Sequence, residues 1–334
     1  MTLIKPTKLR PGDTLGLVAC SAPISGVGPE VLERCFSRLR DLGFTVVEAP
    51  NCRKTFGHAA GTIEERARVL NDFFCDPKIN GIISFWGGHQ SHQLLPHLDF
   101  DMIRKNPKVF VGYSDTTSLQ VGIHQMTGLV TFSGPAGITF GKPTVPEFTT
   151  DFFRKTLMEL NDTLELPAAQ EFSDNPWFAD PDKLMHFKPN PGWNVYRKGV
   201  VIVEGRIVGG NMGTMLLFAG TKYWPDLNDK ILFVEEDESE STGTIDRMFT
   251  QLRHMGVFDE IKALVVGRFH SEVKFKTDDT LEMILDEALR GYDLPVITGV
   301  DFGHTDPLLT IPLGIRCQVD ASKPEIRFLE SGVC

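Results

Sequence analysis

Apolar and polar residues follow two different spacings in the first 140 residues, and these spacings predict strands and helices in turn. Short apolar runs predict strands at 14–19, 44–47, 81–85, 108–111 and 129–132. Apolar residues three or four positions apart predict helices at 30–42, from Thr62 until Pro77, and from Asp115 to about 126. Thr62 and Glu65 have the spacing of a capping box at the start of the second of these helices. Strands that alternate with helices at this spacing indicate a parallel sheet, whose ligands gather at the carboxyl ends of its strands.

The pattern changes after a predicted helix that begins at Glu147. A loop-rich stretch with several aromatic residues follows, and strands return from Gly199 onward in the runs GVVIVEG, ILFVEE and KALVVGRF. A chain of 334 residues is long enough for two domains. We therefore expect an αβ domain at 1–150, a linker with an aromatic loop at 151–198, and a β-rich domain at 199–334.

Composition and charge narrow the classes of protein to consider. The formal net charge is −10, which disfavours a partner with a phosphate backbone, so we expect no nucleic acid polymer as a partner. No apolar run approaches the roughly 20 residues of a membrane span, and none at the N-terminus resembles a signal peptide. The six cysteines lack CxxC spacing, and HExxH is absent. We therefore expect reduced thiols, no metal site, no membrane partner and a cytoplasmic location.

The segment VFVGYSD, which ends at Asp115, predicts a strand, a tight turn and a helix with Ser114 at the turn. Such a turn exposes a serine hydroxyl and points the next backbone N–H at a developing oxyanion. The segment departs from the nucleophile-elbow motif G-x-S-x-G because it lacks the second glycine, and a simple helix cap is the alternative. The pair Gly87–Gly88 also follows an apolar strand, so N–H groups of Gly88 and Asp115 are a plausible oxyanion hole.

A serine nucleophile requires a base and an acid that orients the base. His270 and His304 both follow apolar strands, and local sequence does not choose between them. His89 and His92 could touch a substrate, but two histidines at this spacing are too few for a metal site. Glu235 ends an apolar strand and is a candidate acid, although local sequence by itself favours a solvated acidic turn from Glu235 to Glu240.

With these residues in view, the chain resembles the LD-carboxypeptidase family of serine peptidases, and within it the microcin C immunity-protein branch. The resemblance covers nearly the whole chain, in ordered segments such as LRPGDTLGLVACSAP, KVFVGYSDTTSL, GRIVGGNMGTM, ILFVEEDES and GVDFGHTDPLLTIPLG. It implies an α/β protein with an N-terminal parallel αβ domain of flavodoxin-like type and a C-terminal β-rich, barrel-like domain. It also implies a homodimer.

The resemblance implies a serine amidase that needs no cofactor. Ser114 matches the nucleophile, His304 the base, and Glu235 the acid, with Glu236 next to it as the alternative. Gly88 and Asp115 match the oxyanion donors. Further residues expected to contact the substrate are Gly87, Trp177, Trp193 and Asn211.

Three functions follow as hypotheses. In the immunity-protein branch, the substrate is an amide between a C-terminal aspartyl group and a nucleotide-like moiety, and aromatic residues stack on the base. Trp193 could instead only pack the interdomain loop, and His89 and His92 depart from the small polar or acidic residues common in this loop of the branch. The first alternative is an LD-carboxypeptidase that removes the terminal D-amino acid from murein tetrapeptides. The second, of another class, is a non-catalytic two-domain protein that binds a small molecule.

Overall fold

A computed structural model describes residues 2–175, 177 and 184–334. Its N-terminal part forms a sheet in the order β14-β5-β4-β3-β1-β2, in which β1 to β5 are parallel and β14 is antiparallel. The predicted parallel sheet is thereby confirmed. Its strands are β1 (Thr14–Val18), β2 (Thr45–Glu48), β3 (Gly81–Ser84), β4 (Val109–Gly112), β5 (Phe132–Ser133) and β14 (Ile311–Pro312).

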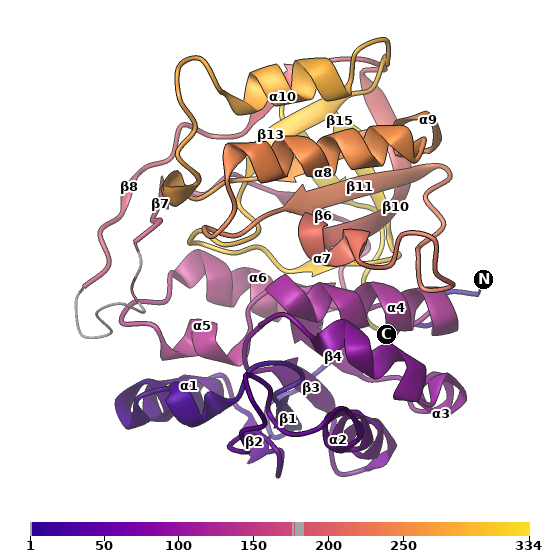
Figure 1. Ribbon diagram of the computed structural model, residues 1–334. Coiled ribbons are helices and arrows are strands. Elements are labelled where there is room, and N and C mark those ends of the chain that lie inside the picture. The colour runs from indigo at the N-terminus through magenta and orange to yellow at the C-terminus, as the bar shows by residue number, and fades with distance from the viewer. Residues whose placement is uncertain (1, 176, 178–183) are drawn as a thin grey trace.

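Helices pack on both faces of this sheet (Figure 1). The capping box predicted for the second helix is present, because Thr62 Oγ1 accepts from Glu65 N at 3.2 Å and Glu65 Oε2 accepts from Thr62 N at 3.0 Å. Helix α4 lies between the two sheets and contacts β10 (Ile202–Asn211) and α7 (Met212–Leu216). The helices of this part are α1 (Pro29–Asp41), α2 (Ile63–Cys75), α3 (Phe100–Lys105), α4 (Thr117–Thr127), α5 (Gly137–Gly141) and α6 (Glu147–Leu157).

The second sheet is mixed, in the order β6-β16-β15-β10-β11-β12-β13-β9. The four strands β10 to β13 are parallel, and the outer strands run antiparallel to their neighbours. The predicted C-terminal domain rich in strands is present, as an open sheet with β6 and β9 at its edges. Its strands are β6 (Leu164–Leu166), β9 (Asn194–Arg197), β10 (Ile202–Asn211), β11 (Lys230–Glu235), β12 (Ala263–Gly267), β13 (Val296–Val300), β15 (Arg316–Asp320) and β16 (Glu325–Phe328).

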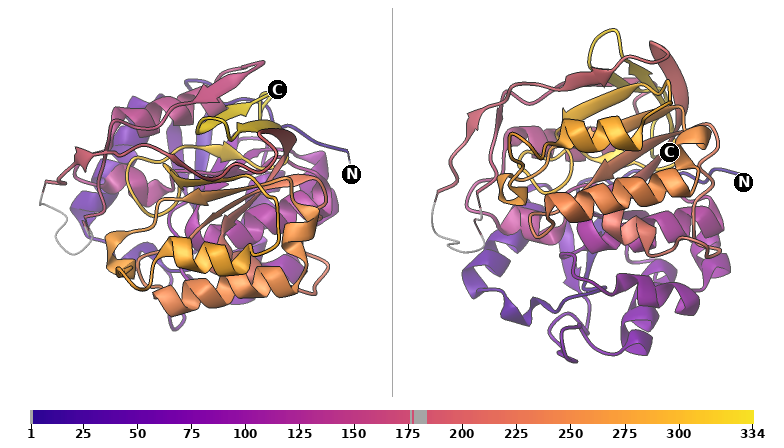
Figure 2. Two further views of the ribbon diagram at one scale, coloured as in Figure 1. Left: turned by 90° about the horizontal axis from the view of Figure 1, so that it is seen from above. Right: turned by 45° about the horizontal axis from the view of Figure 1, so that its top comes forward.

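Helices α8 and α10 lie side by side along the second sheet (Figure 2). Two short antiparallel strands, β7 (Glu171–Phe172) and β8 (Lys188–Pro189), pair with each other at the two ends of the aromatic segment. The remaining helices are α7 (Met212–Leu216), α8 (Thr242–His254), α9 (Val257–Glu260) and α10 (Leu281–Ala288).

The chain crosses between the two sheets more than once. Strands β6 and β9, from the segment expected to be a linker, pair in the second sheet, whereas β14 returns from the C-terminal half to the first sheet. Side chains also bridge the two domains, because Thr117 Oγ1 in α4 accepts from Asn211 N at the end of β10 at 3.0 Å. The two domains are therefore joined by shared strands as well as by side chains.

Candidate active site

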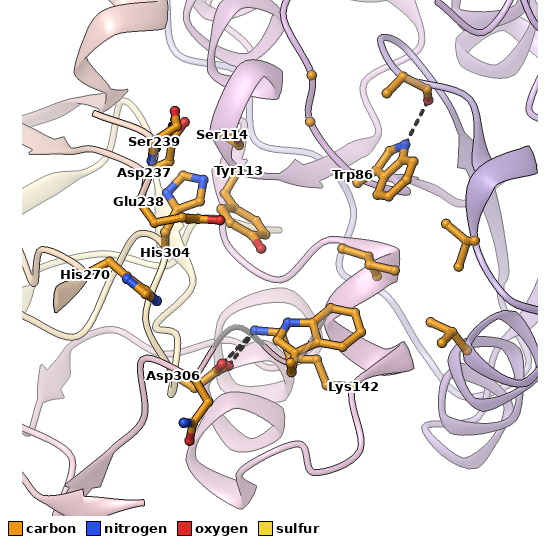
Figure 3. Close-up of a pocket in the computed structure, with 18 of the residues that line it drawn as sticks. Trp86, Tyr113, Ser114, Lys142, Asp237, Glu238, Ser239, His270, His304 and Asp306 are labelled. Carbon is orange, nitrogen blue, oxygen red and sulfur yellow. Dashed lines mark hydrogen bonds and ion pairs between the residues drawn. The ribbon is translucent and has the colours of Figure 1, made fainter. Parts of the chain in front are cut away.

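A cavity of about 570 Å³ opens at the carboxyl end of the first sheet (Figure 3). Strand order reverses between β1 and β3, and such switch points leave a crevice at the carboxyl ends of parallel strands. The loops after β1, β3 and β4 contribute Ala22, Gly87 and Ser114 to its lining, and the second domain contributes Glu238 and His304. The cavity therefore lies where the two halves of the chain meet.

Ser114 occupies the sharp turn that the sequence predicts between β4 and α4. Its φ of 62° lies in the left-handed region, whereas the preceding Tyr113 is extended. This strained conformation lifts the Ser114 side chain into the cavity. A Cβ atom on Gly87 would lie 2.7 Å from Ser114 Oγ, so only glycine fits beside the hydroxyl.

Backbone N–H groups lie next to this serine. The same Cβ position on Gly87 is 3.1 Å from the Asp115 backbone nitrogen, and Asp115 begins the helical turn after Ser114. Gly88 lines the cavity with a φ of 144°, and a Cβ atom there would clash with Ser21 Oγ. The Asp115 carboxylate points away to another backbone, since its Oδ2 accepts from Ser91 N at 2.9 Å.

His304 faces the cavity and is bonded to a buried carboxylate. Its Nδ1 lies 2.6 Å from Glu235 Oε2, and the two side chains are 11% and 2% exposed. The ring also packs edge-on against Tyr113, with ring centroids 5.0 Å apart. Burial works to lower the pKa of His304, but the Glu235 carboxylate outweighs burial and raises it to about 9.

The structure distinguishes Glu235 from its neighbour Glu236. Glu235 ends β11 and contacts His304, whereas Glu236 is buried on the other side of the strand, with its Oε2 3.0 Å from the position of a Cβ on Gly213. Burial, together with the charge of Glu235, raises the pKa of Glu236 to about 9. Glu236 is therefore a neutral acid at pH 7, and Glu235 is the carboxylate positioned to orient His304.

Trp177 and a buried ion pair line the same cavity. Lys142 Nζ lies 5.8 Å from the centre of the Trp177 ring, and it donates to both carboxylate oxygens of Asp306 at 2.9 and 2.7 Å. Sequence reasoning identified neither Lys142 nor Asp306, nor the role of Tyr113 against His304. Lys142 is 164 positions from Asp306, so no local pattern links them, whereas Tyr113 and Asp306 stand within two residues of predicted site residues.

Two residues expected to contact the substrate lie away from the cavity lining. Trp193 is 6% exposed, and its Nε1 donates to Asp301 Oδ2 at 2.8 Å, so it packs within the second domain. Asn211 caps α7, since its Oδ1 accepts from Thr214 N at 3.0 Å. Its backbone N donates to Thr117 Oγ1 and ties β10 to α4. Trp193 Nε1 and Asn211 Oδ1 are thus bonded within the fold around the site, whereas Asn211 Nδ2 is buried with no hydrogen-bond partner among the described residues.

The other histidines divide between the cavity and its surroundings. His89 and His270 line the cavity together with His304, whereas His92 is not among the lining residues. His270 Nδ1 accepts from Glu272 N at 3.1 Å, which leaves Nε2 as its protonated nitrogen.

Among the residues that the structure describes, no group of three or more His, Cys, Asp or Glu side chains is placed to hold a metal ion. In the same residues, no helix has the length and apolar character to cross a membrane.

Comparison with known proteins places this geometry in a family. Residues 15–134 match the LD-carboxypeptidase N-terminal domain and residues 204–319 match the C-terminal domain. The microcin C7 self-immunity protein MccF of Escherichia coli is 37% identical over 325 residues, covering 96% of this chain and 94% of MccF. The putative carboxypeptidase YocD of Bacillus subtilis is 34% identical over 316 residues, covering 94% of this chain and 95% of YocD.

Solved structures agree along the whole chain. An MccF-like protein from Bacillus anthracis str. Ames superposes with a TM-score of 0.92 at 35% identity, covering 98% of this chain and 99% of that one. MccF in complex with aspartyl sulfamoyl adenosine superposes with a TM-score of 0.91 at 34% identity, covering 99% and 100%. Since both domain families match in order and the shared fold spans both domains, this chain belongs to the LD-carboxypeptidase (peptidase S66) family of hydrolases, as its sequence motifs predicted.

Proposed function

We propose that the protein is a serine amidase in which Ser114 is the nucleophile, His304 the general base and Glu235 the orienting acid. One observation carries this proposal. The strained turn presents Ser114 to a cavity that also holds His304, and His304 is bonded through Nδ1 to buried Glu235. With Nδ1 engaged, Nε2 is the ring nitrogen left to exchange a proton with the serine.

The chemical steps follow from these positions. Neutral His304 takes the Ser114 hydroxyl proton at Nε2 while Oγ attacks the amide carbonyl carbon, and the N–H groups of Gly88 and Asp115 stabilise the oxyanion. His304 then gives this proton to the leaving nitrogen as the C–N bond breaks, which leaves a seryl acyl-enzyme. Water attacks the ester carbonyl and loses a proton to His304. The Ser114 oxygen regains that proton as the acid product leaves.

For the substrate, we propose an amide between an aminoacyl group and a nucleotide-like moiety. Relatives of similar fold have been solved with aspartyl sulfamoyl adenosine and with glutamyl sulfamoyl guanosine. Trp177 lines the cavity and offers a surface for a base, and such stacking is worth roughly 1–3 kcal/mol. Asp237 and Glu238 line the cavity too, where they would attract the ammonium group of an aminoacyl substrate.

The test compares wild type and Ser114→Ala on aspartyl sulfamoyl adenosine and on a murein tetrapeptide. We expect the wild type to release sulfamoyl adenosine and the variant to release almost none. Equal turnover by both proteins would exclude Ser114 as the nucleophile. Cleavage of the tetrapeptide alone would make the protein a murein carboxypeptidase, and ligand binding without turnover would make it a binding protein.

A further inference from the structure

His304 lies on an irregular segment between two buried ion pairs. The segment runs from the end of β13 to the start of β14 and carries Asp301 and Asp306, three residues before and two residues after His304. Asp301 pairs with Arg268, and Asp306 pairs with Lys142. The loop that carries the base is thus held by a cation on each side.

The first pair joins the loop to the domain that also carries Glu235. Arg268 follows β12, and its Nη2 lies 3.2 Å from Asp301 Oδ1, with side chains 9% and 1% exposed. Asp301 Oδ2 also accepts from Ala169 N at 2.9 Å and from Trp193 Nε1 at 2.8 Å. This end of the loop is therefore fixed within the second domain.

The second pair joins the loop to the domain that carries Ser114. Lys142 directly follows α5, and its ion pair with Asp306 has side chains only 7% and 4% exposed. The chain around Lys142 is held in turn by Arg38, which donates to Phe140 O and to Pro143 O at 2.9 Å. The backbone on both sides of Lys142 is therefore fixed by hydrogen bonds from Arg38. Figure 3 shows the Lys142 side chain in contact with Asp306 at the edge of the cavity.

Asp306 also links the loop to the aromatic segment. Its backbone exchanges two hydrogen bonds of 2.8 Å with Ser173, which lines the cavity near Trp177. Burial works to lower the pKa of Lys142, but the Asp306 carboxylate outweighs burial and the pKa is raised, so Lys142 stays charged. Removal of one partner of a buried ion pair leaves the other charge buried without compensation, which destabilises the folded arrangement around it.

We propose that the Lys142–Asp306 ion pair is a positioning element that sets how His304 meets Ser114. The proposal rests on the proposed function. Glu235 and His304 belong to one domain and their contact does not pass through Lys142, whereas Ser114 belongs to the other domain. Loss of the ion pair should therefore disturb the Ser114–His304 geometry and leave the Glu235–His304 hydrogen bond in place.

The experiment uses Asp306→Asn and Lys142→Met, with Lys5→Met as the matched control. Lys5 Nζ lies 2.7 Å from Glu330 Oε2 in an ion pair that is 26% and 24% exposed and outside the cavity lining. Two rates are measured: turnover of aspartyl sulfamoyl adenosine, and labelling of Ser114 by a fluorophosphonate, in which the serine oxygen displaces fluoride. We expect both rates to fall about 10- to 100-fold in the two cavity variants, as for a small misplacement of a catalytic group, and not in the control.

A spectroscopic readout separates positioning from loss of fold. We expect the low-field NMR signal of the His304 Nδ1 proton bonded to Glu235 to persist in Asp306→Asn, and the double variant Lys142→Met/Asp306→Asn to be no slower than the slower single variant. Unchanged rates would overturn the inference, as would loss of the NMR signal together with the rates. If wild type is neither labelled nor active, the proposed function fails and the inference with it. If wild type is labelled and Asp306→Asn is labelled equally fast, only the inference fails.

Discussion

His304 Nδ1 lies 2.6 Å from Glu235 Oε2, although the two residues are 69 positions apart in the chain. The contact joins the end of β11 to the loop after β13. In the proposed mechanism, a buried carboxylate at this position would fix the imidazole tautomer and stabilise the imidazolium ion that forms during proton transfer. The pairing also accounts for the raised pKa of His304.

Replacing Glu235 by Gln should lower kcat by about 10³–10⁴-fold, because an amide at this position can hold the wrong tautomer of His304. Glu236→Gln is the matched control, since Glu236 is a neutral acid whose shape glutamine preserves. We expect that variant to keep kcat within about twofold of wild type. Steady-state kinetics at pH 8 on aspartyl sulfamoyl adenosine checks both, and equal losses in the two variants would contradict the assignment of Glu235.

The pH dependence should follow the raised pKa of His304. The free enzyme needs neutral His304, so kcat/KM should rise with pH and level off above about 9. In Glu235→Gln, burial becomes the dominant influence on the pKa, and the rising limb should move to lower pH. Profiles of kcat/KM from pH 6 to 10 check this prediction. If kcat/KM rises over the same pH range in both proteins, the ionisation that controls it belongs to a group other than His304.

The same histidine should make the free energy of unfolding fall as pH rises, whereas kcat/KM rises with pH. Because its folded-state pKa is raised, the stabilisation that it contributes is complete below its ordinary value near 6.5 and is lost as pH rises through about 9. Glu235→Gln should remove this contribution. Denaturant unfolding of wild type and Glu235→Gln at pH 6 and pH 10 should therefore show a larger difference in unfolding free energy at pH 6.

Gly87→Ala should lower kcat by about 10²-fold, because the added Cβ would lie 2.7 Å from Ser114 Oγ and displace the nucleophile. Gly26→Ala is the control, since Gly26 lines the same cavity and its Cβ position has no atom within 4 Å. Rates of fluorophosphonate labelling at Ser114 check the pair. If both variants are labelled as fast as wild type, the close approach of Gly87 does not matter for the nucleophile.

Trp177→Ala should raise KM for aspartyl sulfamoyl adenosine by roughly 5- to 150-fold, which corresponds to the roughly 1–3 kcal/mol of stacking on one base. Turnover of a murein tetrapeptide, which has no base, should change much less. Trp193→Phe should leave KM unchanged and lower the unfolding free energy by about 1–3 kcal/mol, because buried Asp301 loses a hydrogen bond. A raised KM in Trp193→Phe together with an unchanged KM in Trp177→Ala would instead place the base at Trp193.

Much of the fold was predictable because it is encoded locally. Apolar periodicity located the strands and helices of the first domain, and Thr62 with Glu65 marked a helix start that the structure contains. The turn at Ser114 was predictable for the same reason, since it lies between a strand and a helix in continuous sequence. The pairing of β14 with the first sheet and of β6 and β9 with the second was not, because strand partners depend on contacts between distant segments.

By itself, the sequence determined the family, the order of the elements and the short motifs that contain Ser114, Glu235 and His304. Only the tertiary structure decided that Glu235 rather than Glu236 contacts His304, because successive residues at a strand end point to opposite faces. It also decided that Trp177 lines the cavity while Trp193 is buried against Asp301. The pairing of Lys142 with Asp306 across 164 positions follows from the packing of two domains, which no local pattern of residues encodes.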